Sequence, residues 1–352
     1  MREKAFLPDF NDLFLPSAKD FFRRKKEAAR GMPSIIDEAI DRIEDLTLSG
    51  GKRIRPALLY YSYQIFGAGS FEKVKNYCLA LEILHSFALI HDDIMDKGEK
   101  RRGRETASFY FQKKFKSKDL SNNLAILCGD LAFAWADELF YADNNKKLFD
   151  IFSLLKEEVI YGQLLDVVKV KTEAEILQMM QFKTAGYTIE KPLILGALLG
   201  EASEAQLEVL KSMGIALGLA FQIQDDILGV FGETKTLGKP VDSDLKEGKM
   251  NLLAIKTLKK LKGTERSSFL TIWGNPKSGA GQLQKVRQLM AKSGGLEDCL
   301  HDYHKLKKKA LENLKNLTLS QKGNILLSGL IDEILVLDKD NMIGRINSTK
   351  IT

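Results

Sequence analysis

Carboxylates gather in the segment His91–Asp96, at the polar end of an apolar stretch, Leu79–Met95, whose composition predicts a buried helix. Asp92 and Asp96 are four residues apart and therefore share one face of that helix. Like charges at this spacing destabilise a helix by roughly 0.2–0.5 kcal/mol per pair, so the cluster favours bound cations. A second acidic pair, Asp225–Asp226, ends another apolar helix. The two clusters predict a site for magnesium and a polyphosphate, since Mg²⁺ prefers oxygen ligands.

Two basic segments accompany these acids. The first, Gly50–Pro56, places three cations between a glycine pair and a proline suited to the first turn of the next helix. Backbone amides at a helix start, together with arginine forks, make a good pyrophosphate cradle. The second, Lys97–Arg104, follows the first acid cluster directly. A basic turn is more often merely solvated, but its adjacency to carboxylates favours a diphosphate held by metal and guanidinium groups together.

Composition limits the class of protein. The 352 residues are 44% hydrophobic with a net charge of +6, which allows a large core and gives no strong indication of nucleic-acid binding; we expect none. No segment reaches the roughly 18 uncharged apolar residues of a membrane span. The N-terminus lacks the apolar core of a secretory signal, and the three cysteines are odd in number and far apart. We therefore expect a cytoplasmic protein with reduced thiols and no transmembrane segment.

Helical periodicity dominates the chain. The seven prolines fall where this periodicity breaks or restarts, so hardly any is expected inside a helix. Segments 120–140 and 213–230 are apolar nearly all round, as central helices of a bundle are. We predict one all-α domain over residues 1–352, an antiparallel helical bundle. The expected helices span 17–30, 33–48, 55–66, 71–96, 121–142, 144–169, 173–187, 189–200, 203–231 and 250–260, with three more after 278.

Ordered motifs extend this pattern along the chain. They are Gly50–Pro56, Glu82–His85, Leu89–Asp96, Arg101–Gly103, Gly129–Asp130, Gly162–Gln163 with Asp166, Lys183–Thr184, Phe221–Asp226, Gly238–Pro240 and Asp244–Lys249. With these residues in this order, over roughly residues 45–260, the chain resembles the trans-isoprenyl diphosphate synthases, also called polyprenyl synthetases. The resemblance implies an isoprenoid-synthase bundle around a central prenyl-binding cavity and, as in most of the family, a homodimer formed through helices such as 120–140.

The resemblance also implies a reaction. An allylic diphosphate ionises to a carbocation, isopentenyl diphosphate attacks it through its double bond, and loss of a proton leaves a longer allylic diphosphate. Three magnesium ions would bind with the allylic diphosphate and neutralise the departing pyrophosphate. The implied metal ligands are Asp92, Asp93, Asp96, Asp225 and Asp226. The second motif ends at Gly229, where many family members carry another aspartate, which predicts weaker binding of one ion, with Asp225 as the main ligand and Asp244 as a further candidate.

Matching positions give each substrate its own residues. By resemblance, Arg101, Lys183 and Lys239 hold the allylic diphosphate. Isopentenyl diphosphate is held without metal by Lys52, Arg55, His85 and Arg102. The carbocation is stabilised by Lys183 through its carbonyl, by Thr184 and by Gln222. On an apolar helix His85 would ordinarily be a core histidine, and its position before the acid cluster favours the ligand role.

Product length is predicted from the helix before Asp92. Phe87 and Ala88 lie five and four residues earlier, about 6–7.5 Å along the axis at 1.5 Å per residue. An aromatic residue followed by a small one resembles synthases that stop at the twenty-carbon geranylgeranyl diphosphate. A farnesyl or longer-chain synthase is the alternative. Phe87 is then the floor of the growing tunnel, and an alanine there is expected to lengthen the product.

Other classes of protein fit less well. A di-iron bundle needs two Glu-x-x-His elements, and the chain has one, formed by Glu82 and His85. A terpene cyclase or head-to-head synthase shares the acidic motifs but does not need Lys52, Arg55 and Arg102. A non-catalytic subunit that modulates a partner synthase remains an alternative, because a fold alone does not fix activity; such a subunit is expected to have lost acids or arginines from the first cluster.

Overall fold

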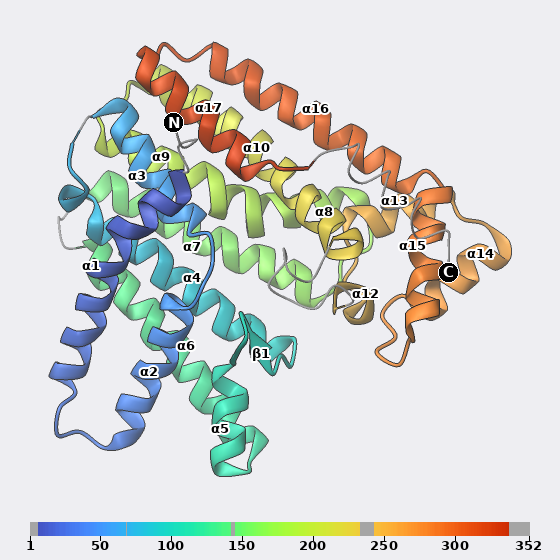
Figure 1. Ribbon diagram of the computed structural model, residues 1–352, viewed down its shortest axis with the longest axis horizontal. Coiled ribbons are helices and arrows are strands. Elements are labelled where there is room, and N and C mark those ends of the chain that lie inside the picture. Colours follow the sequence, from blue (N-terminus) through green and yellow to red (C-terminus); the bar gives the residue numbers. More distant parts are fainter. Residues whose placement is uncertain (1–5, 68, 142–144, 233–242, 338–352) are drawn as a thin grey trace. The chain divides into compact units, whose positions relative to one another are not determined.

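The computed structural model describes residues 6–67, 69–141, 145–232 and 243–337 (Figure 1). These residues form helices joined by short connections, with one two-stranded antiparallel hairpin. The elements are α1 (Phe6–Ala28), α2 (Ser34–Leu48), α3 (Ile54–Phe66), η1 (Phe71–Lys73), α4 (Lys75–Met95), β1 (Lys100–Arg101), β2 (Arg104–Glu105), α5 (Ala107–Phe115), α6 (Lys118–Phe140), α7 (Lys146–Val167), α8 (Glu173–Met180), the π-helix η3 (Gln181–Glu190), α9 (Lys191–Leu199), α10 (Glu204–Phe231), α12 (Ser243–Glu247), α13 (Leu252–Lys260), α14 (Gly263–Ile272), α15 (Ala280–Lys292), α16 (Gly295–Lys315) and α17 (Gln321–Ile334).

The helices group into two compact units. The first unit comprises the chain up to residue 152 with 192–203 and 319–330, and the second comprises 153–191, 204–318 and the chain from 331 onward. Each unit has its own buried apolar core. Phe14, Leu58 and Leu84 are fully buried in the first, and Leu210, Ile227 and Tyr303 are fully buried in the second.

The N-terminal helix differs from the prediction. α1 begins at Phe6, not near residue 17, and Pro16 lies inside it. A proline in a helix interior costs about 3 kcal/mol. This cost is offset because Phe10, Phe14 and Phe22 are buried completely on the inner face of α1, and each such burial contributes about 1.5–3 kcal/mol. Tertiary packing thus overrides the local signal of the proline.

In the first unit, α4 and α6 lie side by side (Figure 1). α4 is buried on most of its length and ends in the acidic motif. The end of α2 is tied to α4 through hydroxyl groups, since Thr47 Oγ1 lies 2.7 Å from Ser86 Oγ. Gly129 of α6 allows a close approach, because a Cβ there would collide with the ring of His91. These contacts fix the end of α4 that carries the carboxylates.

In the second unit, α10 packs against both α16 and η3. The approach of η3 to its neighbours is close enough to require glycine. A Cβ at Gly214 of α10 would lie 2.7 Å from Glu190 Cα, one at Gly218 would overlap Ala185, and one at Gly162 of α7 would lie 2.7 Å from Lys183 Cβ. Three glycines therefore set the π-helix against α7 and α10.

Several elements were not anticipated. The hairpin β1–β2, α5 and α14 form where no regular structure was predicted, because short charged segments give little periodicity. The expected break between residues 187 and 189 is also wrong. There the chain continues from η3 into α9, and the amide of Lys191 donates to the carbonyl of Gly186, the five-residue spacing of a π-helix.

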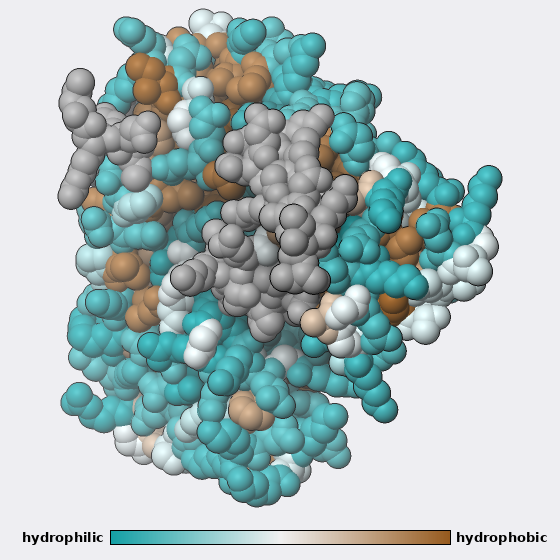
Figure 2. Space-filling model, turned by 45° about the vertical axis from the view of Figure 1, so that its right-hand side comes forward, coloured by the Kyte–Doolittle hydropathy of each residue, from teal (hydrophilic) through white to brown (hydrophobic). Residues whose placement is uncertain are grey.

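Polarity follows the expected distribution. The face in Figure 2 is covered mainly by hydrophilic residues, with apolar residues gathered in a few places. α10 is long and apolar enough to cross a membrane, but 61% of its apolar window is buried inside the protein. That burial fits a core helix.

Candidate active site

The first acidic motif lies at the C-terminal end of α4. Asp92 and Asp93 belong to its last turn and Asp96 is the C-cap. Asp93 is 4% exposed, and burial raises the pKa of its carboxyl to about 6, although Arg101 acts in the opposite direction. Arg101 Nε donates to Asp93 Oδ1 at 2.7 Å, and Arg101 Nη2 lies 3.3 Å from Asp92 Oδ2. One guanidinium thus spans both carboxylates.

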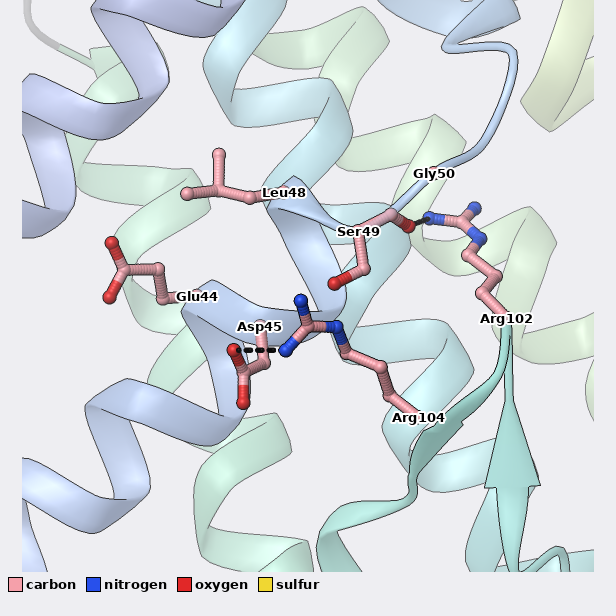
Figure 3. Close-up of a pocket in the computed structure, with 7 residues that line it drawn as sticks. All are labelled: Glu44, Asp45, Leu48, Ser49, Gly50, Arg102 and Arg104. Carbon is pink, nitrogen blue, oxygen red and sulfur yellow. Dashed lines mark hydrogen bonds and ion pairs between the residues drawn. The ribbon is translucent and has the colours of Figure 1, made fainter.

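The hairpin β1–β2 carries the arginines to the end of α2 (Figure 3). Arg102 Nη1 donates to the carbonyls of Leu46 and Ser49, at 3.3 and 3.2 Å. Arg104 Nη1 donates to Asp45 Oδ1 at 3.2 Å. These groups line a pocket of about 540 Å³ that is also bounded by Glu44, Leu48 and Gly50. The side chains and backbone groups that line the pocket are mostly polar.

His85 lies among these arginines. Burial lowers the pKa of its imidazole well below the ordinary value, and the charges of Arg55, Arg102 and Arg101 add to the effect. The imidazole is therefore neutral near pH 7. Lys52 is exposed on the α2–α3 turn and Arg55 is half-buried in the first turn of α3. The four residues predicted to hold isopentenyl diphosphate thus belong to one unit. Two of them, Arg55 and Arg102, contribute to the lowered pKa of a third, His85.

The second acidic motif belongs to α10, in the other unit. Asp225 is exposed and Asp226 is 9% exposed. Gln222 Nε2 donates to Asp226 Oδ1 at 2.7 Å, and Thr184 Oγ1 donates to Gln222 Oε1 at 2.5 Å. This chain links the π-helix to the acidic motif. It joins both neutral side chains predicted to face the carbocation to one of the predicted metal ligands.

Lys183 has a partner that was not assigned a role. Its Nζ lies 2.5 Å from Asp166 Oδ2, and Lys249 Nζ lies 3.4 Å from the same oxygen. Asp166 is on α7, three residues after Gln163 in the motif of the sequence. An acid that gathers two lysines holds them in place for an anion, so Asp166 belongs to the candidate site. The motif in the sequence included Asp166, but its distance in sequence from both lysines gave no indication that it pairs with them.

Two further charged residues were missed because they face inward. Glu82 is 2% exposed. Burial raises the pKa of its carboxyl, while Arg102, Arg53 and Arg55 favour the ionised form. Arg53 is 6% exposed. No sequence signal distinguishes its direction from that of Lys52 or Arg55. Lys239, predicted to hold the allylic diphosphate, lies outside the described residues, as does the side chain of Asp244.

Aromatic rings surround the predicted chain-length position. Phe87 is half-buried, and its ring centroid lies 4.8 Å from that of His91 and 4.9 Å from that of Phe133 on α6, both in edge-to-face contact. Ala88 is also half-buried. The ring of Phe87 is therefore braced by α6 and by the residue that precedes Asp92.

The donor set fits magnesium. All predicted ligands are carboxylates, and Mg²⁺ is commonly bound through one or two of these together with substrate phosphates. Within the described part of the chain, no three acidic, histidine or cysteine side chains already converge as a complete metal site. Ions that bind together with a diphosphate need no such complete cage, so the residues present suit the implied ions.

Fold and side chains together define a class. An all-helical bundle with acidic motifs on two long helices, and arginines beside the first, is an isoprenoid-synthase fold. The family model of the polyprenyl synthetases matches residues 37–290, and the chain belongs to this family. It is a trans-prenyl diphosphate synthase, a prenyltransferase, and the predicted class and all-α fold are confirmed.

Known relatives support this assignment. The chain is 36% identical to the short chain isoprenyl diphosphate synthase of Methanocaldococcus jannaschii over 68% of this chain and 72% of the relative. It is 35% identical to the geranylgeranyl diphosphate synthase of Saccharolobus solfataricus over 79% and 83%. A structure of geranylgeranyl pyrophosphate synthase from Corynebacterium glutamicum, complexed with isoprenyl diphosphate and magnesium, has a TM-score of 0.88 at 25% identity, covering 94% and 99% of the two chains. Other relatives are geranylfarnesyl, nonaprenyl and farnesyl diphosphate synthases, so product length differs within the family.

Proposed function

We propose that this protein condenses isopentenyl diphosphate head-to-tail with an allylic diphosphate and stops at geranylgeranyl diphosphate. The observation that carries the proposal is the arrangement of two neighbouring arginines. Arg101 pairs with Asp93 and Asp92, whereas Arg102 packs on the α2–α3 turn that carries Lys52. Both, with Arg55, also lower the pKa of His85. A cluster of basic side chains thus adjoins a carboxylate site in one unit, as two diphosphates with different requirements need.

The residues divide the reaction between them. Lys52, Arg55, His85 and Arg102 would bind isopentenyl diphosphate, and Arg101, Lys183 and Lys239 the allylic diphosphate. Magnesium held by Asp92, Asp93, Asp96, Asp225 and Asp226 would neutralise the departing pyrophosphate; a set of three ions belongs to the proposal.

The carbon skeleton changes at the allylic carbon. Its C–O bond breaks, the pyrophosphate keeps the electron pair, and the double bond of isopentenyl diphosphate forms the new C–C bond before a proton is lost. Thr184 and Gln222, with the Lys183 carbonyl, present oxygen dipoles to the positive carbon. Two hydrogen bonds support this role: Gln222 Nε2 donates to Asp226 Oδ1 and Gln222 Oε1 accepts from Thr184 Oγ1, so the protein itself orients both side-chain dipoles.

The experiment is a condensation assay. The purified protein is incubated with magnesium, isopentenyl diphosphate and five-, ten- or fifteen-carbon allylic diphosphate, and the products are dephosphorylated and analysed by chain length. We expect a twenty-carbon terminus and loss of turnover in excess EDTA. In the same assay F87A should lengthen the product, whereas F115A, at a 38% exposed ring on α5, should not.

Each outcome has a distinct meaning. A wild-type product of another length refutes the twenty-carbon assignment. Unchanged lengths with F87A remove Phe87 as the floor. No condensation from any starter favours the non-catalytic subunit, with Gly229 in place of an acid as the structural reason. Addition of a partner synthase would then change that partner's product.

Assembly and location complete the proposal. We propose a cytoplasmic homodimer, formed in part through α6. Ile126 and Leu127 of α6 are 41% and 62% exposed, and Ile160 and Leu164 of α7 are 41% and 58% exposed. Apolar side chains exposed at this density on a helix are typical of an interface.

A further inference from the structure

The three cations of the α2–α3 turn have different surroundings. Lys52 is exposed and Arg55 is half-buried, whereas Arg53 is 6% exposed. The guanidinium of Arg53 lies 5.7 Å from the ring centroid of Phe14 in α1. A side chain in this position does not reach a ligand in the pocket. The burial of a permanently charged group therefore calls for a role inside the protein.

Arg53 and Arg102 divide the carbonyls at the end of α2 between them. Arg53 Nη2 donates to the carbonyls of Thr47 and Leu48, at 3.2 and 3.0 Å. Arg102 Nη1 takes those of Leu46 and Ser49, and Figure 3 shows its guanidinium directed at Ser49. The last carbonyls of a helix lack intrahelical partners and carry its negative dipole end. Two guanidiniums thus satisfy four consecutive carbonyls and are themselves compensated.

The remaining contacts of Arg53 close the turn. Its Nη1 lies 3.3 Å from the carbonyl of Gly51 and 3.3 Å from Asn11 Oδ1 of α1. The turn needs such support, because Gly50, Gly51 and Arg53 all have left-handed φ values, of 60°, 83° and 48°. A non-glycine residue in this region is strained and persists only where its surroundings hold it. Arg53 is therefore both a strained residue and the side chain that fixes the turn.

The α2–α3 turn also positions Arg102. A Cβ at Gly51 would lie 2.8 Å from Arg102 Cζ, so the guanidinium of Arg102 packs directly on the backbone that Arg53 holds. Lys52 and Arg55 are the residues on either side of Arg53 and Ile54. Three of the four residues proposed to bind isopentenyl diphosphate thus depend on the conformation of residues 50–53.

We propose that Arg53 is a positioning residue for the isopentenyl diphosphate site. It does not touch the diphosphate; it locks the α2–α3 turn onto the end of α2, so that Lys52, Arg55 and Arg102 form their cradle before substrate arrives. The inference rests on the proposed function. Its consequence is selective, because Arg101 is held independently through Asp93 and Asp92. Loss of Arg53 should weaken binding of isopentenyl diphosphate without equal effect on the allylic substrate.

The test uses R53M and R53K, with R23M as the matched control. Arg23 is an exposed arginine of α1 paired with Asp20 and Glu27, so R23M removes the same charge away from the turn. KM for each substrate is measured by steady-state kinetics, and the affinity for isopentenyl diphosphate alone by calorimetry. We expect R53M to weaken the affinity for isopentenyl diphosphate and to raise the KM for this substrate by about tenfold or more, since charge-assisted hydrogen bonds are lost. The KM for the allylic diphosphate should stay within about twofold of the wild-type value. R53K should be intermediate and R23M unchanged.

A milder variant, N11A, tests the proposal even if the Arg53 variants fail to fold. N11A removes one acceptor from Arg53 and leaves the arginine in place, and it should shift KM for isopentenyl diphosphate in the same direction by a smaller factor. Parallel increases in both KM values, or a fall in kcat alone, would overturn the positioning role. Equal calorimetric affinity of wild type and variants, or binding by none of them, would also overturn it. Absence of condensation in wild type and R23M bears instead on the proposed function, and calorimetry then decides on Arg53 by itself.

Discussion

At the scale of single residues, basic side chains cluster at the proposed diphosphate site. The buried carboxyl of Glu82 and the dipole of α2 compensate part of their charge. Glu82 is buried within electrostatic range of Arg102, Arg53 and Arg55. Burial raises the pKa of its carboxyl, while the arginines favour its charged form. The dipole of α2 compensates two of the same arginines. Such compensation keeps the cluster stable without a bound anion, and the exposed Lys52 remains available to the diphosphate of the proposed site.

The protonation of His85 gives a prediction for stability. Burial, together with Arg55 and Arg102, holds its folded-state pKa well below 6.5. Below about pH 6.5 the unfolded chain binds a proton at His85 that the folded protein does not. The stabilising contribution is thus complete above that pH and is lost as the pH falls, by about 1.4 kcal/mol per unit.

We expect H85N to lack this slope. In urea unfolding, the free-energy difference between wild type and H85N should fall by about 1 kcal/mol between pH 7.5 and 5.5. H304N is the matched control, since His304 lies on α16 in the other unit. The difference in unfolding free energy between wild type and H304N should change less over the same pH range. Parallel pH profiles for wild type and H85N would contradict a depressed pKa.

At the scale of elements, the sequence predicted the helices that have a clear apolar periodicity. Amphipathic or apolar helices such as α2, α6 and α10 were expected within a few residues of their bounds. The π-helix was not, because a widening of the turn over ten residues leaves the apolar pattern almost unchanged. Pro16 was read as a helix boundary, yet the aromatic packing of α1 outweighs it. For the candidate site, the order of the motifs put Asp92, Asp93 and Arg101 close together in the sequence, and they are in contact in the structure. The direction of Arg53, in contrast, depends on a left-handed turn that the sequence did not predict.

The glycines beside the π-helix give the element-scale prediction. Gly218 of α10 packs on Ala185, next to Thr184, and has no room for a Cβ. G218A should therefore destabilise the protein by about 1–3 kcal/mol, the usual cost of overpacking. It should also lower the condensation rate, because a displaced π-helix disturbs the hydrogen bond between Thr184 and Gln222.

Gly281 supplies the control. It lies in the first turn of α15, where a Cβ would meet nothing within 4 Å. G281A should leave the condensation rate unchanged and raise stability by up to about 1 kcal/mol, through the reduced entropy of the unfolded chain. Both variants are compared by chemical denaturation and by initial rate. If G218A behaves like G281A, the packing of α10 against η3 does not set the geometry of this part of the site.

At the scale of the whole molecule, exposed apolar side chains favour association with a second copy of the chain. α6 is buried on one side against α4 and exposes Leu120, Ile126 and Leu127 on another. Burying one leucine side chain contributes about 1.5–3 kcal/mol. In a symmetric dimer each such residue acts twice, once in each copy. Exposed leucines along α6 would therefore favour the proposed homodimer.

The proposed dimer predicts a specific response to charge. Wild-type protein should sediment as a dimer of the 39.5 kDa chain, and L127E should sediment as a monomer, since a desolvated carboxylate without a partner is costly at an interface. L270E, at a 49% exposed leucine of α14, makes the same change elsewhere and should remain a dimer. Helix content by circular dichroism should be unaltered in both, because neither side chain is buried within one chain. A wild-type monomer would contradict the proposed homodimer, and dimers of L127E as stable as those of L270E would place the interface away from α6.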